Sequence, residues 1–181
     1  MNLRIYLSFI FLWCLAADAS GQLTTWSADR PLQWSDFRRS DAPKRKSMDA
    51  YVYTLLMDKM DYCTLDSIHV TVTAQCSSDK SWKKHEKLGP YLLNHEQLHF
   101  DITELYARKL RKDIHDAERS PKHSKHTREW FSSVYVHTTG KLRQCQRRYD
   151  RQTKHSKNRE MQRQWNKKIA KELAELKEYA L

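Results

Sequence analysis

Glycine and proline are scarce in this chain, which has three glycines and four prolines among its 181 residues. Folds with many loops or many short strands use both residues at their turns. Their scarcity therefore argues against a loop-rich or all-β fold. The sequence also has no C-x-x-C pair, so a structural zinc–thiolate site is not expected.

Long apolar runs are missing from all but the start of the chain. Met1–Arg4 is short and basic, an apolar run extends from Ile5 to Ala17, and Ala17-Asp18-Ala19 has the A-x-A pattern of a cleavage site. This run is too short for a stable membrane span, and no later segment is apolar enough for one. Residues 1–21 are therefore predicted to be a secretory signal peptide, and residues 22–181 a single exported domain, periplasmic or extracellular.

Acidic residues are outnumbered in this chain. It has 33 Lys and Arg against 22 Asp and Glu, and its net charge of +11 does not change when the predicted signal peptide, with Arg4 and Asp18, is removed. A basic surface favours anionic partners such as envelope polymers, acidic proteins or nucleic acid. No nucleic-acid-binding motif accompanies the charge, and the alternative is a solvated basic face without a dedicated partner.

Three cysteines lie outside the predicted signal peptide: Cys63, Cys76 and Cys145. An exported chain permits disulfides. Cys63 and Cys76 flank an apparent strand and are the preferred pair, which would leave Cys145 free; Cys145 pairing with either of them is the alternative. The odd number leaves at least one thiol unpaired within the monomer.

The periodicity of the apolar residues predicts an α+β domain, in which a small antiparallel sheet precedes three helices. Residues 22–47 are expected to be extended with a short strand. The remaining expected elements are strands at 50–56 and 68–74, a turn-rich connection at 77–84, and helices at about 91–117, 125–151 and 157–180. Ser120-Pro121 should end the first helix, and Thr138-Thr139-Gly140 is a place where the second could bend.

His95-Glu96-Gln97-Leu98-His99 is the most informative motif, an H-E-x-x-H inside the first expected helix. Residues four apart on a helix lie about 40° from each other, so both imidazoles share one face and are able to hold one Zn²⁺. Glu96 lies at the edge of that face, where a carboxylate serves as general base towards water. The alternative is two surface histidines on a basic helix.

Catalytic zinc sites use three protein ligands, and the motif supplies two. Glu104 lies about 180° around the helix from His95 and is expected to pair with Arg108 instead. His155, in the polar connection between the last two helices, is the preferred third ligand, although capping a helix end is an alternative role for it. Glu118, Glu129 and Glu160 are weaker candidates.

The helix motif has a wider context that resembles a known family. Residues 92–108 follow the pattern Leu-Leu-x-His-Glu-Gln-x-His-Phe-Asp-Ile-x-Glu-Leu-x-Ala-Arg, which is similar to the signature of the bacterial family catalogued as domain of unknown function 922. Trp34-Ser35-Asp36-Phe37, Ser81-Trp82 and the segment 149–158 resemble its other marks. Its members are described as secreted, predicted zinc-dependent proteases, so the resemblance implies an exported metallohydrolase with a zincin-like active-site helix.

The leading hypothesis is therefore an exported zinc metallopeptidase. His95, His99 and His155 would hold Zn²⁺, Glu96 would deprotonate the attacking water, and Tyr149 could donate a hydrogen bond to the oxyanion. One alternative is a non-catalytic envelope-binding protein that keeps a metal site. Another is a metal-dependent hydrolase of a non-protein amide.

Overall fold

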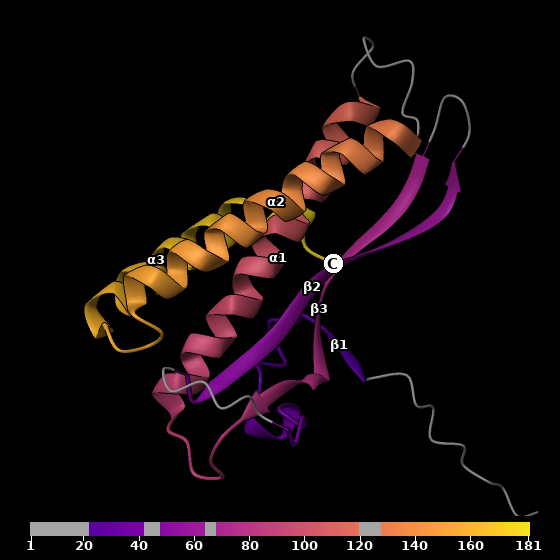
Figure 1. The fold of residues 1–181 in the computed structure, drawn as a ribbon. Coiled ribbons are helices and arrows are strands. Elements are labelled where there is room, and N and C mark those ends of the chain that lie inside the picture. The colour runs from indigo at the N-terminus through magenta and orange to yellow at the C-terminus, as the bar shows by residue number, and fades with distance from the viewer. Residues whose placement is uncertain (1–21, 42–47, 64–67, 120–127) are drawn as a thin grey trace, which may run out of the picture.

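The fold is known from a computed structural model that describes residues 22–41, 48–63, 68–119 and 128–181. A three-stranded antiparallel sheet is followed by three helices, which confirms the predicted α+β class (Figure 1). The predicted signal peptide and the expected helix break at Ser120-Pro121 lie outside the described residues. Among the described residues, no helix is both long enough and apolar enough to cross a membrane.

The sheet has the order β1-β3-β2, so β2 is an edge strand. The short strand β1 (Leu23–Thr25) confirms the one expected in the extended N-terminal segment, and a 3₁₀ helix, η1 (Trp34–Asp36), follows it. Strands β2 (Ala50–Cys63) and β3 (Ile68–Lys83) form a twisted hairpin and are longer than predicted.

The prediction of a separate connection at residues 77–84 is wrong, because β3 continues through it. The register moves from Tyr51 opposite Trp82 to Tyr53 opposite Ser77, so β3 has extra residues that bulge out of the ladder. The buried Ser81 hydroxyl accepts the Tyr53 N–H at 2.9 Å and donates to the Ser77 carbonyl at 2.7 Å. The polar residues that suggested a turn therefore lie in this bulge, where Ser81 forms hydrogen bonds with backbone groups that the ladder leaves unpaired.

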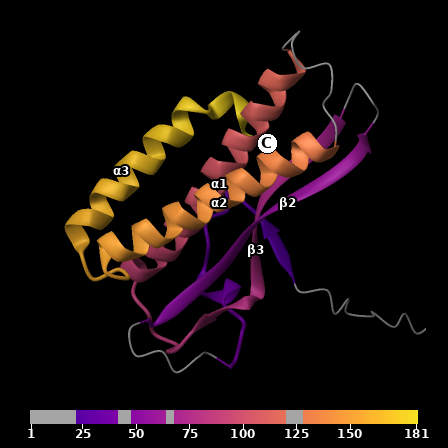
Figure 2. The ribbon, with the colours of Figure 1, turned by 45° about the horizontal axis from the view of Figure 1, so that its top comes forward.

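The three helices lie on one face of the sheet, with α1 packed against β2, β3, α2 and α3 (Figures 1 and 2). Helix α1 (Pro90–Glu118) begins with a proline at its first position, where no backbone N–H is needed. Helix α2 (Arg128–Thr153) continues unbroken through Gly140. Helix α3 (Arg159–Glu175) begins where the Asn158 side chain accepts the Met161 N–H, and a 3₁₀ turn, η2 (Lys177–Tyr179), follows it.

One core joins the sheet to the helices. Its buried apolar side chains come from every layer and include Val52, Leu56, Val72, Ala74, Leu98, Ile102, Leu105, Leu110, Leu142, Tyr149, Trp165 and Ile169. The apolar stripe of α1 is part of this core, and its burial fixes the rotation of α1 about its axis. The same rotation decides which polar face of α1 meets α2.

The predicted Cys63–Cys76 disulfide is wrong. Cys76 is a buried free thiol that faces the Ser81 hydroxyl at 3.7 Å, and burial raises its pKa to about 11. Cys63 stands opposite Ile68 in the ladder, at the far end of the hairpin. Eight residues of strand separate Ile68 from Cys76, about 26 Å at 3.3 Å per residue, which no disulfide spans. Cys145 is also a free, buried thiol.

Glu104 lies inside the helical layer. It accepts a hydrogen bond from Arg108 at 2.9 Å, as predicted, and from Arg111 at 3.0 Å. The two guanidiniums continue to the carbonyls of Leu173 and Val72, so this network ties α1 to α3 and to β3. All three charged side chains are nearly buried.

Glu104→Gln should lower the free energy of unfolding by about 3 kcal/mol, because two buried guanidiniums lose their counter-charge. Urea unfolding followed by circular dichroism measures this loss. Asp116→Asn is the control, since it removes an exposed carboxylate on the same helix that pairs with Lys112. The control should leave the midpoint almost unchanged. Equal effects of the two substitutions would contradict a buried role for Glu104.

Candidate metal centre

His95 and His99 lie one turn apart on the face of α1 that meets α2. Their ring centroids are 5.0 Å apart and their planes are nearly perpendicular. The His95 side chain is 3% exposed and that of His99 is 14% exposed, so neither is an ordinary surface histidine. Burial of the apolar stripe of α1 turns both imidazoles towards the helical layer.

Asp150 of α2 completes a three-residue cluster with these histidines. Its Oδ1 lies 3.4 Å from His95 Nε2 and 3.0 Å from His99 Nε2. One ligand atom from each residue lies within 4.8 Å of the other two, and among the described residues this is the one such group of His, Cys, Asp or Glu. We call His95, His99 and Asp150 the central cluster.

Two glutamines fix the orientation of both imidazoles. Gln162 Oε1 lies 2.9 Å from His95 Nδ1, and Gln146 Oε1 contacts His99 Nδ1. The Gln146 amide nitrogen donates to the His99 carbonyl at 2.9 Å, so its oxygen must be the atom that faces the ring. An amide oxygen only accepts, so each Nδ1 carries a proton, and in the neutral form of each imidazole Nε2 keeps a lone pair.

The two Nε2 lone pairs therefore converge on the Asp150 carboxylate. Three acceptors this close repel one another unless a cation or a proton lies between them. Burial lowers the pKa of His99, but Asp150 and Glu96 outweigh it and raise that pKa above its usual value. Burial likewise raises the pKa of Asp150, while hydrogen bonds to both imidazoles bring it well below its usual range.

This donor set fits a divalent metal. Two imidazoles and one carboxylate are the ligands of a common class of catalytic zinc site. Metal-bound histidines also donate their second ring N–H to an oxygen acceptor, which Gln146 and Gln162 provide here. The residues thus supply both the ligand atoms and the groups that orient them.

Glu96 lies beside the central cluster and is 3% exposed. Its Oε2 accepts the Val52 N–H at 2.9 Å, from the edge of β2 that faces away from β3. Burial raises the pKa of Glu96, although His99 and His95 act in the opposite direction. A carboxyl group with a raised pKa is a stronger base when ionised, as proton transfer near neutral pH requires.

A comparison with known protein families gives a match that includes the H-E-x-x-H motif. Residues 33–156 match the model of a family described as a bacterial protein of unknown function (DUF922). The chain belongs to this family. A search of curated proteins and a search of solved structures each found no match. The matched part of this DUF922 protein contains the central cluster, Glu96 and His155, and it ends before Gln162.

Asp150 is not among the ligands that the sequence of this DUF922 chain predicted, although the sequence does contain a signal for it. It is the one acidic residue between Glu129 and Glu160, in a stretch rich in Lys and Arg. An isolated carboxylate on a basic helix indicates a specific role better than an acid among many acids does. Its approach to α1 depends on how two distant helices pack, which no local pattern contains.

His155 lies next to the central cluster but is not one of its three members. Lys154, His155 and Ser156 all have positive φ, between 50° and 69°, an uncommon conformation for residues other than glycine. This turn brings His155 Nδ1 to 3.5 Å from Asp150 Oδ1, buried and without a hydrogen-bond partner among the described residues. Its role as a metal ligand stays a prediction.

Tyr149 packs directly against the cluster. Its ring stacks on His95 with centroids 4.7 Å apart, and its hydroxyl lies 2.8 Å from Gln162 Oε1 and 3.2 Å from the His95 carbonyl. The side chain is fully buried, and burial raises its pKa far above the usual value. In this arrangement Tyr149 orients His95, and its role as an oxyanion donor stays a prediction.

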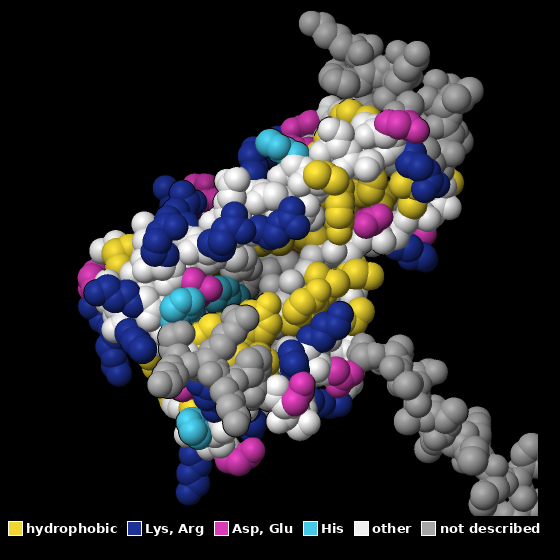
Figure 3. Space-filling view, viewed as in Figure 1, with side chains coloured by type: hydrophobic (Ala, Val, Ile, Leu, Met, Phe, Trp, Pro, Cys, Tyr) yellow, Lys and Arg dark blue, Asp and Glu magenta, His cyan; other side chains and the backbone are white. Residues whose placement is uncertain are grey.

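Two hollows meet at the central cluster of this DUF922 protein. One of about 100 Å³ is lined by His95, Glu96, His155 and residues of the segment 48–51. The other, of about 260 Å³, lies between β2 and α2, and both hollows share Tyr51, His99 and Asp150. Figure 3 shows the surface hollowed here, between Lys and Arg side chains over α2 and hydrophobic ones over β2. We call this pair of hollows the groove.

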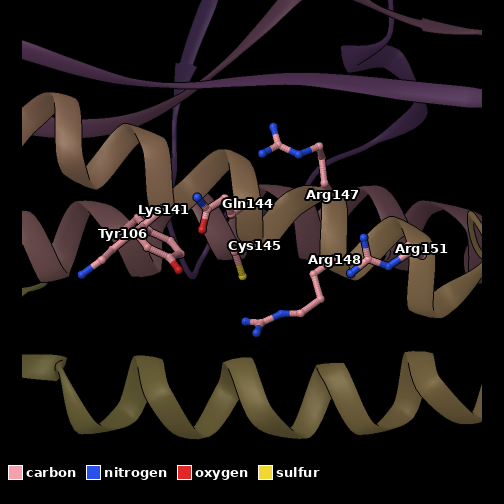
Figure 4. A pocket seen from close by; sticks show the side chains of 7 residues that line it. All are labelled: Tyr106, Lys141, Gln144, Cys145, Arg147, Arg148 and Arg151. Atoms are coloured by element: carbon pink, nitrogen blue, oxygen red, sulfur yellow. The ribbon is translucent and has the colours of Figure 1, made fainter.

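A larger hollow of about 350 Å³ lies elsewhere, on the side of α2 that faces α3. It is lined by Tyr106, Lys141, Gln144, Cys145, Arg147, Arg148 and Arg151 (Figure 4). It contains none of the cluster residues. Among the described residues, Arg147 alone borders both this hollow and the groove.

Proposed function

We propose that this protein is a zinc-dependent peptidase. The observation that carries the proposal is a buried Glu96 beside two imidazoles whose Nε2 atoms converge on a carboxylate, at the meeting point of two hollows. A metal-storage or purely structural site has no need of a carboxylate that is held next to the ligands and bonded to a strand edge.

A bound Zn²⁺ would supply a Lewis acid that polarises the substrate carbonyl and acidifies water. His95, His99 and Asp150 would hold it, and His155 is the alternative third ligand. Glu96 takes a proton from the attacking water as the oxygen bonds to the carbonyl carbon. The same proton passes from Glu96 to the amide nitrogen as the carbon–nitrogen bond breaks, so Glu96 ends as it began.

Metal content and chelation test this proposal. The purified protein should contain one zinc per chain by elemental analysis and should cleave members of a peptide library. Removal of zinc by a chelator should abolish cleavage, and stoichiometric zinc should restore it. Iron as the bound metal would contradict the proposal, because two histidines and a carboxylate also serve non-haem iron. Cleavage that survives removal of the metal would contradict it too.

A second candidate function is binding without catalysis. The net charge of +11 favours adhesion to anionic envelope polymers, with the metal site kept for stability. This candidate predicts salt-sensitive binding to anionic polymers and no hydrolysis of any peptide in the presence of zinc. A hydrolase of non-protein amides would use the same residues and would differ in its substrate alone.

Export of the protein is part of the proposal. It is supported by the basic start, apolar run and A-x-A site of residues 1–21, which we propose are removed to leave residues 22–181 as a single domain. A periplasmic or extracellular location agrees with a hydrolase whose substrates lie outside the cytoplasm. N-terminal sequencing of the protein recovered from its native compartment would locate the cleavage site.

A further inference from the structure

The larger hollow of the groove forms an arm that leads away from His99, and its two walls differ in the chemistry of their side chains. On the β2 side it is lined by Tyr51, Val52 and Thr54, and on the α2 side by Leu142, Arg143, Gln146 and Arg147. It has a volume of about 260 Å³ and continues into the central cluster through His99 and Asp150. A peptide that reaches the cluster along this arm passes both walls.

The two arginines belong to the same stripe of α2 as the cluster residue Asp150. Arg143, Gln146, Arg147 and Asp150 follow the spacing i, i+3, i+4 and i+7, which places them on one face of a helix. Gln146 and Asp150 both contact His99 from this face. The guanidiniums therefore continue the face that forms the metal centre. Figure 4 shows Arg147 on the strand side of α2 and Arg148 on the side of α3.

No acid within the described residues balances these charges. Neither Arg143 nor Arg147 forms an ion pair with any described residue, and Asp150 is engaged by the two imidazoles. Like charges four residues apart destabilise a helix. The helix dipole favours cations in the last turn, which accounts for Arg151 but not for Arg143, ten residues before the end of α2. An anion in the groove would balance the pair.

We propose that Arg143 and Arg147 select peptide substrates with acidic side chains close to the scissile bond, an inference that rests on the proposed peptidase function. Along α2, Arg147 lies about 4.5 Å from Asp150 and Arg143 about 10.5 Å, at 1.5 Å per residue. An extended peptide advances about 3.3 Å per residue. Glutamate or aspartate one to three residues from the scissile bond, on one side of it, would meet the guanidiniums. Tyr51, Val52 and Leu142 would pack against the apolar parts of the same peptide.

Binding to a protein that does not turn over tests this selection separately from catalysis. The zinc-loaded Glu96→Gln protein is titrated with two fluorescein-labelled pools of random octapeptides, identical except that one has three fixed glutamates where the other has three glutamines. The glutamate pool should bind roughly three- to tenfold more tightly at low salt, with the difference shrinking as salt rises. The double substitution Arg143→Gln and Arg147→Gln should remove the difference.

A matched control removes two exposed cations from α3 instead, through Lys167→Gln and Lys171→Gln. This control should keep the preference for the glutamate pool, because those residues do not border the groove. Equal loss in both double variants would overturn the proposal in favour of a diffuse charge effect. Inorganic polyphosphate is a third probe in the same assay. Arginine-dependent binding of polyphosphate, with no preference between the two peptide pools, would also overturn the proposal.

The outcomes separate the two proposals. Cleavage of peptides without any preference for acidic residues would overturn the selection and leave the peptidase intact. Arginine-dependent binding of the glutamate pool without cleavage by the parent protein would support the selection and overturn the peptidase function.

Discussion

Glu96→Gln should retain zinc and lose about 10²–10⁴-fold of kcat/KM towards peptides. Glutamine has nearly the same shape, and its amide oxygen is still able to accept the Val52 N–H at the place of the carboxylate. It has no oxygen that takes a proton from water. The variant should therefore keep the groove and lose only the base. Peptide cleavage assays and zinc analysis on the same preparation measure both quantities.

The control for this substitution is Glu175→Gln, which removes an exposed carboxylate at the end of α3. It should cleave peptides as well as the parent protein does. Thermal unfolding of both variants in the presence of zinc checks that neither has lost its fold. A Glu96→Gln protein that cleaves at the parent rate would remove Glu96 from the mechanism. One that cleaves slowly but has also lost zinc would assign Glu96 to the metal site instead.

Asp150→Ala should weaken zinc binding by at least about 100-fold. Loss of a single residue that only orients a metal ligand already costs 10- to 100-fold in affinity, and Asp150 faces both Nε2 atoms directly. Competition with a chelating dye measures zinc affinity without any substrate, so the result does not depend on catalysis. The same assay on Gln146→Ala should show the smaller loss expected from a group that only orients His99.

His155→Ala is the matched comparison for Asp150→Ala, since Asp150 lies in the last turn of α2 and His155 in the turn that follows the helix. We expect the smaller loss from His155→Ala, because its side chain is 40% exposed and its Nδ1 faces Asp150. A large loss in His155→Ala with little change in Asp150→Ala would make His155 the third ligand, as its place in the sequence suggests. A large loss in both would indicate four protein ligands and would leave no position for water.

The sequence predicted the elements that depend on local patterns. The apolar spacing predicted a first helix over 91–117, and α1 spans Pro90–Glu118. The α+β class and the pairing of Glu104 with Arg108 also follow from spacing alone. Thr138-Thr139-Gly140 was a place where the second helix could bend, and α2 continues unbroken through it, because a single glycine costs a helix only about 1 kcal/mol.

The predictions that failed required contacts between distant segments. The disulfide prediction took Cys63 and Cys76 as neighbours because they flank a strand, and the hairpin register places them far apart. A separate connection at 77–84 was predicted from the polar residues there, but these residues form a bulge within β3. Strand register depends on pairing energies along the entire hairpin, and these cannot be read from either strand separately.

By itself, the sequence determined the part of the site that one helix carries. A period of 3.6 residues is enough to place His95, Glu96 and His99 on neighbouring positions of a single face. The third member of the central cluster was decided only by the tertiary structure. Asp150 lies 51 residues from His99, and the two meet because α1 buries one apolar stripe against the sheet and presents the adjoining face to α2. Helix periodicity acts within a segment, whereas the rotation of one helix against another follows from the packing of the complete core.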